Sequence, residues 1–427
     1  MGRARSLLFL LLVPAMAAEA VVFGNLELRW EHTSYQGCGS YGEQWLDLGD
    51  RDRDGWSGGV QGLMREGECN SAEVYSLFVD RRFAEGPLSG VRLGRFQRID
   101  AAGYYYLDGL VLSGRMRHGI GWELFGGKPR REEFYAAPEH IQDADDRLAG
   151  KRLLGVRGST RLPVWESTEQ DRVEAGLGMR HLWGNGGHHD RLDGRFHGSW
   201  RQLPAGIRRA DLDGAASLRL EQGEIESFDT RARLYFGPRG FVGVRGMTFD
   251  PPDDPVTFRD RFYLFYARGS QRNWELMAQN ETPGGVQVGF SVKRIEREQG
   301  DDGYAGELYS RIRRWRGGQL KGRLGVIYVG DERSQLTYLE GERVLSSLSL
   351  LKLAASRIED KNLLSGDKLV HTLELKLDWM LKRDLFLGVT AEHAWIDHKD
   401  INGLDDDYRV GIHLKYRLPA SGQEDYR

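Results

Sequence analysis

The stretch YRVGIHLKYRL, from Tyr408 to Leu418, alternates strictly between two kinds of side chain. One parity is apolar or aromatic and holds Tyr408, Val410, Ile412, Leu414, Tyr416 and Leu418. The other parity is cationic or small and holds Arg409, Gly411, His413, Lys415 and Arg417. Because successive side chains of a strand point to opposite faces, this stretch predicts a β-strand with one apolar and one polar face.

The length of this strand and its aromatic ends are typical of a membrane-spanning strand. A strand that crosses a bilayer at a tilt needs roughly 9 to 11 residues, and this one has eleven. Tyr408 and Tyr416 would lie at the two interfaces, where an amphipathic ring keeps its hydroxyl in water. From this strand alone, a half-buried strand of a soluble sandwich remains the alternative.

The stretch also resembles the C-terminal sorting signal of bacterial outer-membrane barrels. That signal has a polar residue, a glycine and two hydrophobic or aromatic positions, here Arg409, Gly411, Leu414 and Tyr416. The resemblance implies a transmembrane β-barrel. Such proteins usually end on an aromatic residue, whereas this chain continues to Arg427, so we expect residues 419–427 to form a short periplasmic tail.

The composition agrees with a barrel that has a wet lumen. Mean hydropathy is -0.53 and charged residues make up 29% of the 427 residues, as expected when only alternate strand residues face lipid. The net charge of -3 excludes a strongly basic nucleic-acid binder. We therefore expect outer-membrane lipid and lipopolysaccharide as surroundings, and no nucleic-acid partner.

Residues 1–20 read as a signal peptide. Arg3 and Arg5 form a short positive region, residues 7–13 are apolar, and small-residue cleavage sites end at Ala17 or Ala20. No later apolar run is long enough for a transmembrane helix. These features predict export to the outer membrane of a Gram-negative bacterium.

Cys38 and Cys69 are the only cysteines, and both lie in the polar segment 33–71. In an oxidising compartment we predict a disulfide between them, with two free thiols as the alternative. The sequence has no CxxCH motif, so we expect no covalently attached haem and no cofactor. The segment itself is either an inward-folded constriction or an external loop.

A regular meander of strand patterns fills residues 21–418. We expect one all-β, antiparallel transmembrane barrel of about 18 to 20 strands. Short connections are predicted at 85–87, 237–240, 339–341 and 382–384, and longer ones at 128–150, 250–257, 358–367 and 398–407. The predicted strands are 21–31, 72–83, 91–98, 105–116, 120–127, 151–162, 169–183, 192–203, 208–221, 224–237, 240–249, 258–269, 271–281, 285–297, 305–315, 319–337, 342–357, 368–382, 385–397 and 408–418.

The parity opposite the apolar one should line the lumen, and cations outnumber acids there. The predicted lumen cations are Arg29, Arg180, Arg195, Arg201, Lys321, Arg323, Lys376, Arg409, Lys415 and Arg417. The predicted lumen acids are Glu27, Glu31, Glu174, Glu374 and Asp378. A lumen with this bias favours anionic permeants, although some of these cations should serve only as partners of neighbouring carboxylates.

Two other sets of residues suggest chemistry. His197 and Ser199 share one strand face, which is compatible with a base and a nucleophile, but no third residue or oxyanion donor can be named. His188, His189 and Asp190 contain metal-ligand types in a glycine-rich segment, where an exposed turn is the simpler interpretation. We therefore expect neither an enzyme nor a metal site.

The stretch VRLGRFQRIDAAGYYYLDGLVLSGRMRHGIGWELFGG, residues 91–127, resembles the early hairpin of alginate-export-like outer-membrane barrels. It is also similar to the barrel components of porin-cytochrome electron conduits. Both resemblances imply a large barrel in which Arg95 and Asp108 face the interior. Independently of either family, these two residues read as a charged pair across neighbouring strands, and Gly94, Gly109 and Gly114 would let the strands bend.

The function that these patterns favour is a passive channel for small hydrophilic, anionic solutes. Arg95, Arg180, Arg195, Arg201, Arg323 and Lys376 are its predicted lumen residues. The alternatives are a barrel scaffold around a periplasmic multihaem cytochrome and an alginate-like polysaccharide exporter. A channel or exporter predicts that 33–71 or 128–150 folds inward, whereas a scaffold predicts a wide lumen without a constricting segment.

Overall fold

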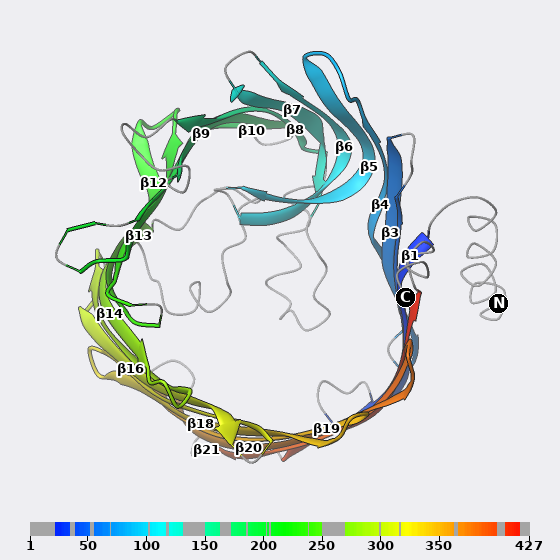
Figure 1. Cartoon of the computed structure of the whole chain (residues 1–427), viewed down its shortest axis with the longest axis vertical. Helices are drawn as coiled ribbons and strands as arrows, with labels where there is room; N and C mark the ends of the chain where they lie inside the picture. Colours follow the sequence, from blue (N-terminus) through cyan, green and yellow to red (C-terminus); the bar gives the residue numbers. More distant parts are fainter. Residues whose placement is uncertain are drawn as a thin grey trace.

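The protein is a closed antiparallel β-barrel of 22 strands in its computed structural model (Figure 1). The structure describes residues 22–34, 39–51, 55–68, 70–100, 103–116, 119–130, 150–162, 172–184, 187–201, 203–204, 206–237, 239–249, 270–298, 300–315, 317–362, 366–398 and 406–418. The strands are β1 (Val22–Thr33), β2 (Ser40–Arg51), β3 (Trp56–Gly67), β4 (Ser71–Arg82), β5 (Leu88–Asp100), β6 (Gly103–Arg115), β7 (Gly121–Arg130), β8 (Arg152–Leu162), β9 (Arg172–Gly184), β10 (Gly187–Arg201), β11 (Arg209–Arg219), β12 (Glu224–Tyr235), β13 (Phe241–Phe249), β14 (Gln271–Glu281), β15 (Val286–Arg297), β16 (Gly303–Trp315), β17 (Gly318–Val329), β18 (Glu332–Ser346), β19 (Ser349–Asn362), β20 (Gly366–Lys382), β21 (Leu385–His398) and β22 (Asp407–Leu418).

Each strand pairs with the next along the chain, and the last strand closes the ring on the first. β22 pairs antiparallel with β1, from Gly24 opposite Leu418 to Thr33 opposite Arg409. The start of β1 and the end of β22 therefore lie at the same rim, which we call the terminal rim. The predictions of an all-β fold and of a single antiparallel barrel are confirmed.

The strand count exceeds the expected 18 to 20 because β2, β3 and β18 were not predicted as separate strands. Segment 33–71 contributes β2 and β3 to the wall, so it is not an inward constriction. Residues 339–341, predicted as a turn, lie inside β18, where Glu340 pairs in register with Lys321 of β17. The predicted strand 258–269 lies outside the described residues, and β13 pairs directly with β14.

Several other predictions also fall on residues outside the described ranges. These are the signal peptide, both cysteines, the 419–427 tail and most of 128–150. The two longest connections, 131–151 and 250–270, join strands at the rim opposite the terminal rim. We call this second rim the opposite rim.

The outer face of the barrel is apolar along most of its circumference. Large hydrophobic side chains on this parity are exposed, such as Leu177 at 58%, Leu324 at 51% and Ile412 at 47%. An exposed apolar band of this kind is expected where alternate strand residues contact lipid. Among the described residues, no helix is both long and apolar enough to span a bilayer.

Three strands depart from the smooth wall. Towards the opposite rim, β5, β6 and β7 leave their neighbours and bend into the ring, where they form the cyan segment that projects into the interior in Figure 1. The ladder between β4 and β5 ends at Leu77 opposite Arg95, and the ladder between β7 and β8 ends at Gly127 opposite Leu153. We call the inward segment, residues 95–100, 103–108 and 128–130, the flap.

A row of glycines marks the line along which the flap bends. Gly94, Gly109 and Gly127 are direct register partners across β5, β6 and β7. A Cβ on Gly109 would lie 2.0 Å from the carbonyl oxygen of Gly126, and one on Gly94, whose φ is +126°, 2.2 Å from that of Leu77. Glycine permits both the backbone angle and this close approach, which larger residues would prevent.

The flap bridges two parts of the inner wall. On one face, Tyr106 packs against Tyr75 and Leu63, and Tyr75 stacks on Trp45 with ring centroids 5.7 Å apart. On the other face, the fully buried Tyr105 and Leu107 belong to a cluster of inward-facing side chains, the remaining members being Phe96, Val111, Phe125, Leu153 and Leu182. Apolar packing on both faces therefore holds the flap inside the lumen.

Candidate functional site, the barrel lumen

The strand registers decide which charged residues face the lumen. All ten predicted lumen cations lie on the inner parity: Arg29, Arg180, Arg195, Arg201, Lys321, Arg323, Lys376, Arg409, Lys415 and Arg417. Inner-parity carboxylates accompany them on most strands, so the lumen is mixed in charge. The cationic excess is local, and the two sides of the barrel differ.

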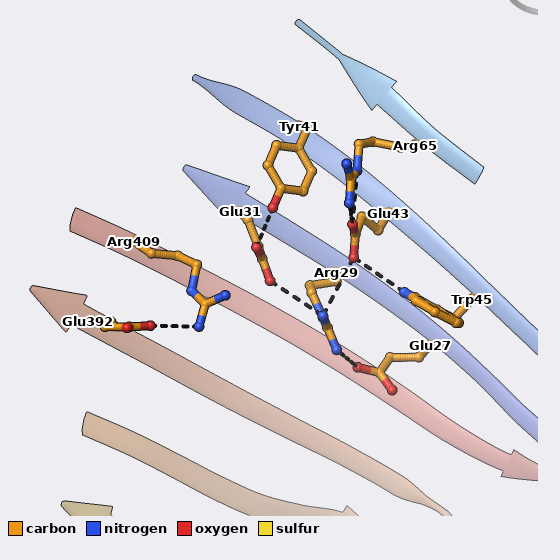
Figure 2. A network of polar contacts seen from close by, with 9 residues as sticks. All are labelled: Glu27, Arg29, Glu31, Tyr41, Glu43, Trp45, Arg65, Glu392 and Arg409. Carbon is orange, nitrogen blue, oxygen red and sulfur yellow. Dashed lines mark hydrogen bonds and ion pairs between the residues drawn. The ribbon is translucent and has the colours of Figure 1, made fainter. Parts of the chain in front are cut away.

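Acids and cations are interleaved on the side where the barrel closes (Figure 2). Arg29 of β1 lies among three carboxylates, 2.9 Å from Glu27 and 3.5 Å from both Glu31 and Glu43. Glu43 also pairs with Arg65 and accepts a hydrogen bond from Trp45 Nε1 at 3.3 Å. Most of the positive charge here is therefore neutralised by adjacent carboxylates.

Three further predicted pore cations also have acidic partners. Arg409 lies 2.6 Å from Glu392 (Figure 2), and Arg323 lies 2.6 Å from Glu307. The longer Lys376 Nζ–Asp378 Oδ2 distance is 3.7 Å. These pairs make the wall hydrophilic without giving it a net positive surface.

Beside the flap, by contrast, arginines gather. Arg98, Arg157, Arg180 and Arg195 line a recess of about 250 Å³ together with Phe125. The guanidinium of Arg98 lies 3.6 Å from the centre of the Phe125 ring and 2.5 Å from Glu123 Oε1. Directly opposite Arg180 in the β9–β10 register lies Arg191, which is buried and pairs with Glu226. This sector offers more guanidinium groups than carboxylates, which suits anionic groups.

A second recess extends the arginine sector towards the terminal rim. It holds about 650 Å³ next to the flap, and Arg98 and Arg157 line both recesses. Arg92 also lines it, with its Nη2 3.2 Å from Asp80 Oδ2. The two recesses share arginines, so positive side chains follow the inner wall past the flap.

Arg95 and Asp108 are paired across β5 and β6 just above the glycine row. Arg95 Nε lies 2.5 Å from Asp108 Oδ1, and Arg130 of β7 lies 2.6 Å from Asp108 Oδ2. Arg95 also donates a 2.7 Å hydrogen bond to the Val74 carbonyl on β4. Arg95 and Asp108 have the same strand parity as the exposed Leu93 and Leu110, which is opposite to the parity of the lumen arginines. The triad therefore lies at the root of the flap.

His197 and Ser199 face the lumen but bind different partners. His197 Nδ1 lies 2.6 Å from Asp213 Oδ1, and Ser199 Oγ donates a 2.8 Å hydrogen bond to Asp211 Oδ1. Each side chain is thus oriented by its own aspartate on β11. The geometry does not present the histidine as a base for the serine.

The sequence did not reveal the flap or three of the arginines in and beside it. Arg98 and Arg157 lie on strands whose inner parity was not assigned, and Arg191 lies just before the predicted start of its strand at residue 192, inside β10. The glycine row was a usable signal, because Gly94 and Gly109 were identified as bend positions, but their alignment with Gly127 requires the strand register. Of 128–150, only Lys128 to Arg130 and Gly150 are described, and Lys128 to Arg130 form the end of β7 in the flap.

No family model and no curated protein matches this chain. Solved structures do. The ferric enterobactin receptor PfeA of Pseudomonas aeruginosa, as a mutant, matches with a TM-score of 0.58 at 10% identity, covering 93% of this chain and 80% of that one. The fold is that of an outer-membrane β-barrel.

Two further receptors have the same likeness. The siderophore receptor PirA of Pseudomonas aeruginosa matches with a TM-score of 0.57 at 10% identity, over 92% of this chain and 80% of that one. The FrpB iron transporter of Neisseria meningitidis matches with a TM-score of 0.51 at 10% identity, over 92% and 82%. At these identities the likeness concerns the outer-membrane barrel fold alone.

Proposed function

We propose that this barrel is a passive channel in the outer membrane of a Gram-negative bacterium and that it passes small hydrophilic, anionic solutes. The observation that carries the proposal is the flap, which narrows the lumen next to the arginine recess. A solute that crosses the barrel must pass between this flap and the opposite wall. The arginines beside the flap then act where the passage is narrowest.

The flap also bears on the alternative of a cytochrome scaffold. A barrel that encloses a protein partner needs a wide lumen, and the flap occupies part of it through the buried Tyr105, Tyr106 and Leu107. Withdrawing the flap would expose these side chains to water, at a cost of roughly 1.5–3 kcal/mol for each large apolar side chain. The packing therefore favours a narrowed channel.

The mixed charge of the rest of the lumen fits a channel for hydrophilic solutes. Paired charges such as Arg323–Glu307 and Arg409–Glu392 keep the wall wet without binding one ion tightly. Conduction requires attraction that is strong enough for entry and weak enough for exit. A single arginine sector on a mixed wall meets both requirements.

Ion selectivity in a planar bilayer tests the proposal. With a KCl gradient, we expect the wild-type reversal potential to show preference for chloride. Arg195→Gln should reduce the chloride-to-potassium permeability ratio by about two-fold or more, because its exposed guanidinium group lines the recess. Arg343→Gln is the matched control, since Arg343 lies on the outer parity of β18 and its loss should leave the ratio unchanged.

Two results would contradict this function. A cation preference of the wild-type protein would mean that the carboxylates of the mixed wall, not the arginine sector, control permeation. Absence of conductance from folded protein would indicate an occupied barrel, and a scaffold for a partner such as a multihaem cytochrome would become the better hypothesis.

A further inference from the structure

A group of histidine and carboxylate side chains lies outside the lumen, on the outer face at the opposite rim. His181 is on β9, His188 and Asp190 are on β10, and Glu221 is in the turn between β11 and β12. The group lies above the apolar band, here formed by Leu177 and Met179. The proposed channel makes no use of these residues.

Three of these residues direct ligand atoms to one point. Each residue offers one ligand atom, a ring nitrogen of His188 and a carboxylate oxygen of Asp190 and of Glu221. These three atoms all lie within 4.8 Å of one another. His188 Nε2 is 3.9 Å from Glu221 Oε1. Donor atoms bound to one zinc ion lie at most about 4 Å apart, so small side-chain rotations complete the arrangement.

Backbone contacts bring the three ligand-bearing segments together. The β9–β10 register sets Asp190 opposite His181, and Leu220 N donates a 2.9 Å hydrogen bond to the Asp190 carbonyl. Asp190 N in turn donates to Glu221 Oε1 at 3.1 Å. The turn of β11–β12 is therefore fixed against β10, and Glu221 is aimed at the site before any ligand binds.

A fourth residue orients the aspartate. His181 Nδ1 lies 2.5 Å from Asp190 Oδ1, while its ring stacks on Trp183 with centroids 5.1 Å apart. The ring of His188 lies 6.2 Å from that of His181. A histidine held between an indole and a carboxylate ligand is a typical outer-shell partner in metal sites, where such contacts fix the ligand orientation.

We propose that His188, Asp190 and Glu221 bind one divalent transition-metal ion of the zinc class, with His181 as the positioning residue. The two carboxylates balance the charge of the ion, and the imidazole favours zinc or copper over calcium and magnesium, which prefer oxygen ligands alone. Three protein ligands on an exposed rim leave a fourth position for water. Among the described residues this is the only such group.

Metal titration of the purified full-length barrel in detergent tests this site. Zinc should bind with a stoichiometry near one, measured by calorimetry. His188→Ala and Asp190→Asn should each weaken zinc affinity roughly 10-fold or more, since each removes a direct ligand. His189→Ala is the matched control, because the adjacent His189 points to the opposite face and its loss should leave the affinity unchanged.

Copper gives an independent spectroscopic readout. Bound Cu²⁺ should quench the fluorescence of Trp183, which stacks on His181, and this quenched fraction should disappear in Trp183→Phe and in His188→Ala. The proposal is wrong if zinc does not bind the wild-type barrel, or if His188→Ala and Asp190→Asn bind it as tightly as His189→Ala does. None of these measurements depends on ion conduction, so the site can fail while the channel stands.

Discussion

The flap and the wall from β14 to β22 are built from the same alternating sequence pattern, yet only one of them bends into the lumen. Along β14–β22 each ladder runs nearly the full length of its strands, for example from Arg333–Lys361 to Ser346–Ser349 between β18 and β19. By contrast, the β4–β5 and β7–β8 ladders stop at the level of Gly94 and Gly127. Aligned glycines, not a change of hydrophobic pattern, distinguish the two regions.

The two regions also differ in how their charged side chains are arranged. The smooth wall carries cations that are paired one by one with carboxylates, as in Arg323–Glu307. The wall beside the flap collects arginines around a recess. The narrowing of the lumen and the group of arginines therefore coincide in one sector. The rest of the barrel wall is hydrophilic and mixed in charge. The following predictions test whether the two regions differ in function as they do in shape.

Removing the flap should have the largest effect. We expect that replacing residues 96–107 by a two-residue Asn-Gly turn raises single-channel conductance at least about two-fold, because the obstruction leaves the lumen. The matched control shortens the β17–β18 hairpin of the smooth wall by replacing residues 328–333 in the same way. If both deletions change conductance equally, the flap is not the constriction.

Changing the bend itself should have an intermediate effect. Gly109→Ala places a Cβ 2.0 Å from the Gly126 carbonyl oxygen, so the strands must shift apart, at a cost of about 1–3 kcal/mol. Gly325→Ala on β17 is the control, since the nearest atom to its Cβ would be Leu336 Cβ at an ordinary 3.7 Å. Thermal unfolding followed by heat-modifiable gel mobility should show a lower midpoint for Gly109→Ala alone.

The smallest effect concerns the charges at the root of the flap. Asp108→Asn leaves Arg95 and Arg130 without their shared carboxylate, and we expect a loss of about 1–2 kcal/mol because the triad is only partly shielded from solvent. Glu392→Gln breaks a more exposed pair on the smooth wall and should cost less than about 1 kcal/mol. Equal unfolding midpoints for the two variants would mean that the triad does not hold the flap.

The sequence was informative where one parity is uniformly apolar. Residues 408–418 show this most clearly, and β22 spans Asp407–Leu418. β2 was missed because its outward residues include Gly42 and Gln44, which do not read as a lipid face. Leu339-Glu340-Gly341 looked like a turn because it combines a charge and a glycine, but Glu340 faces Lys321 across the ladder. Composition cannot separate a turn from a lumen-facing charge next to a glycine.

Of the candidate site, the sequence predicted individual inward residues but not their grouping. Arg180 and Arg195 were identified from parity, and the recess that they share with Arg98 and Arg157 depends on the register of four strands. The Arg95–Asp108 contact was expected as a pair, whereas its third member, Arg130, belongs to a strand whose end was read as a loop. Pairing between strands is a property of the assembled sheet, so parity alone could not reveal it.

The seam between β1 and β22 has a consequence for how the chain reaches its final state. His32 Nε2 and Tyr408 Oη lie 3.1 Å apart across that seam, although 376 positions separate them in the sequence. Contacts between such distant residues form slowly, because a very long loop must first be closed. Until β22 emerges, β1 presents an open edge that could pair with another chain. Pairing of β22 with β1 therefore removes the open edge at which a second chain could add.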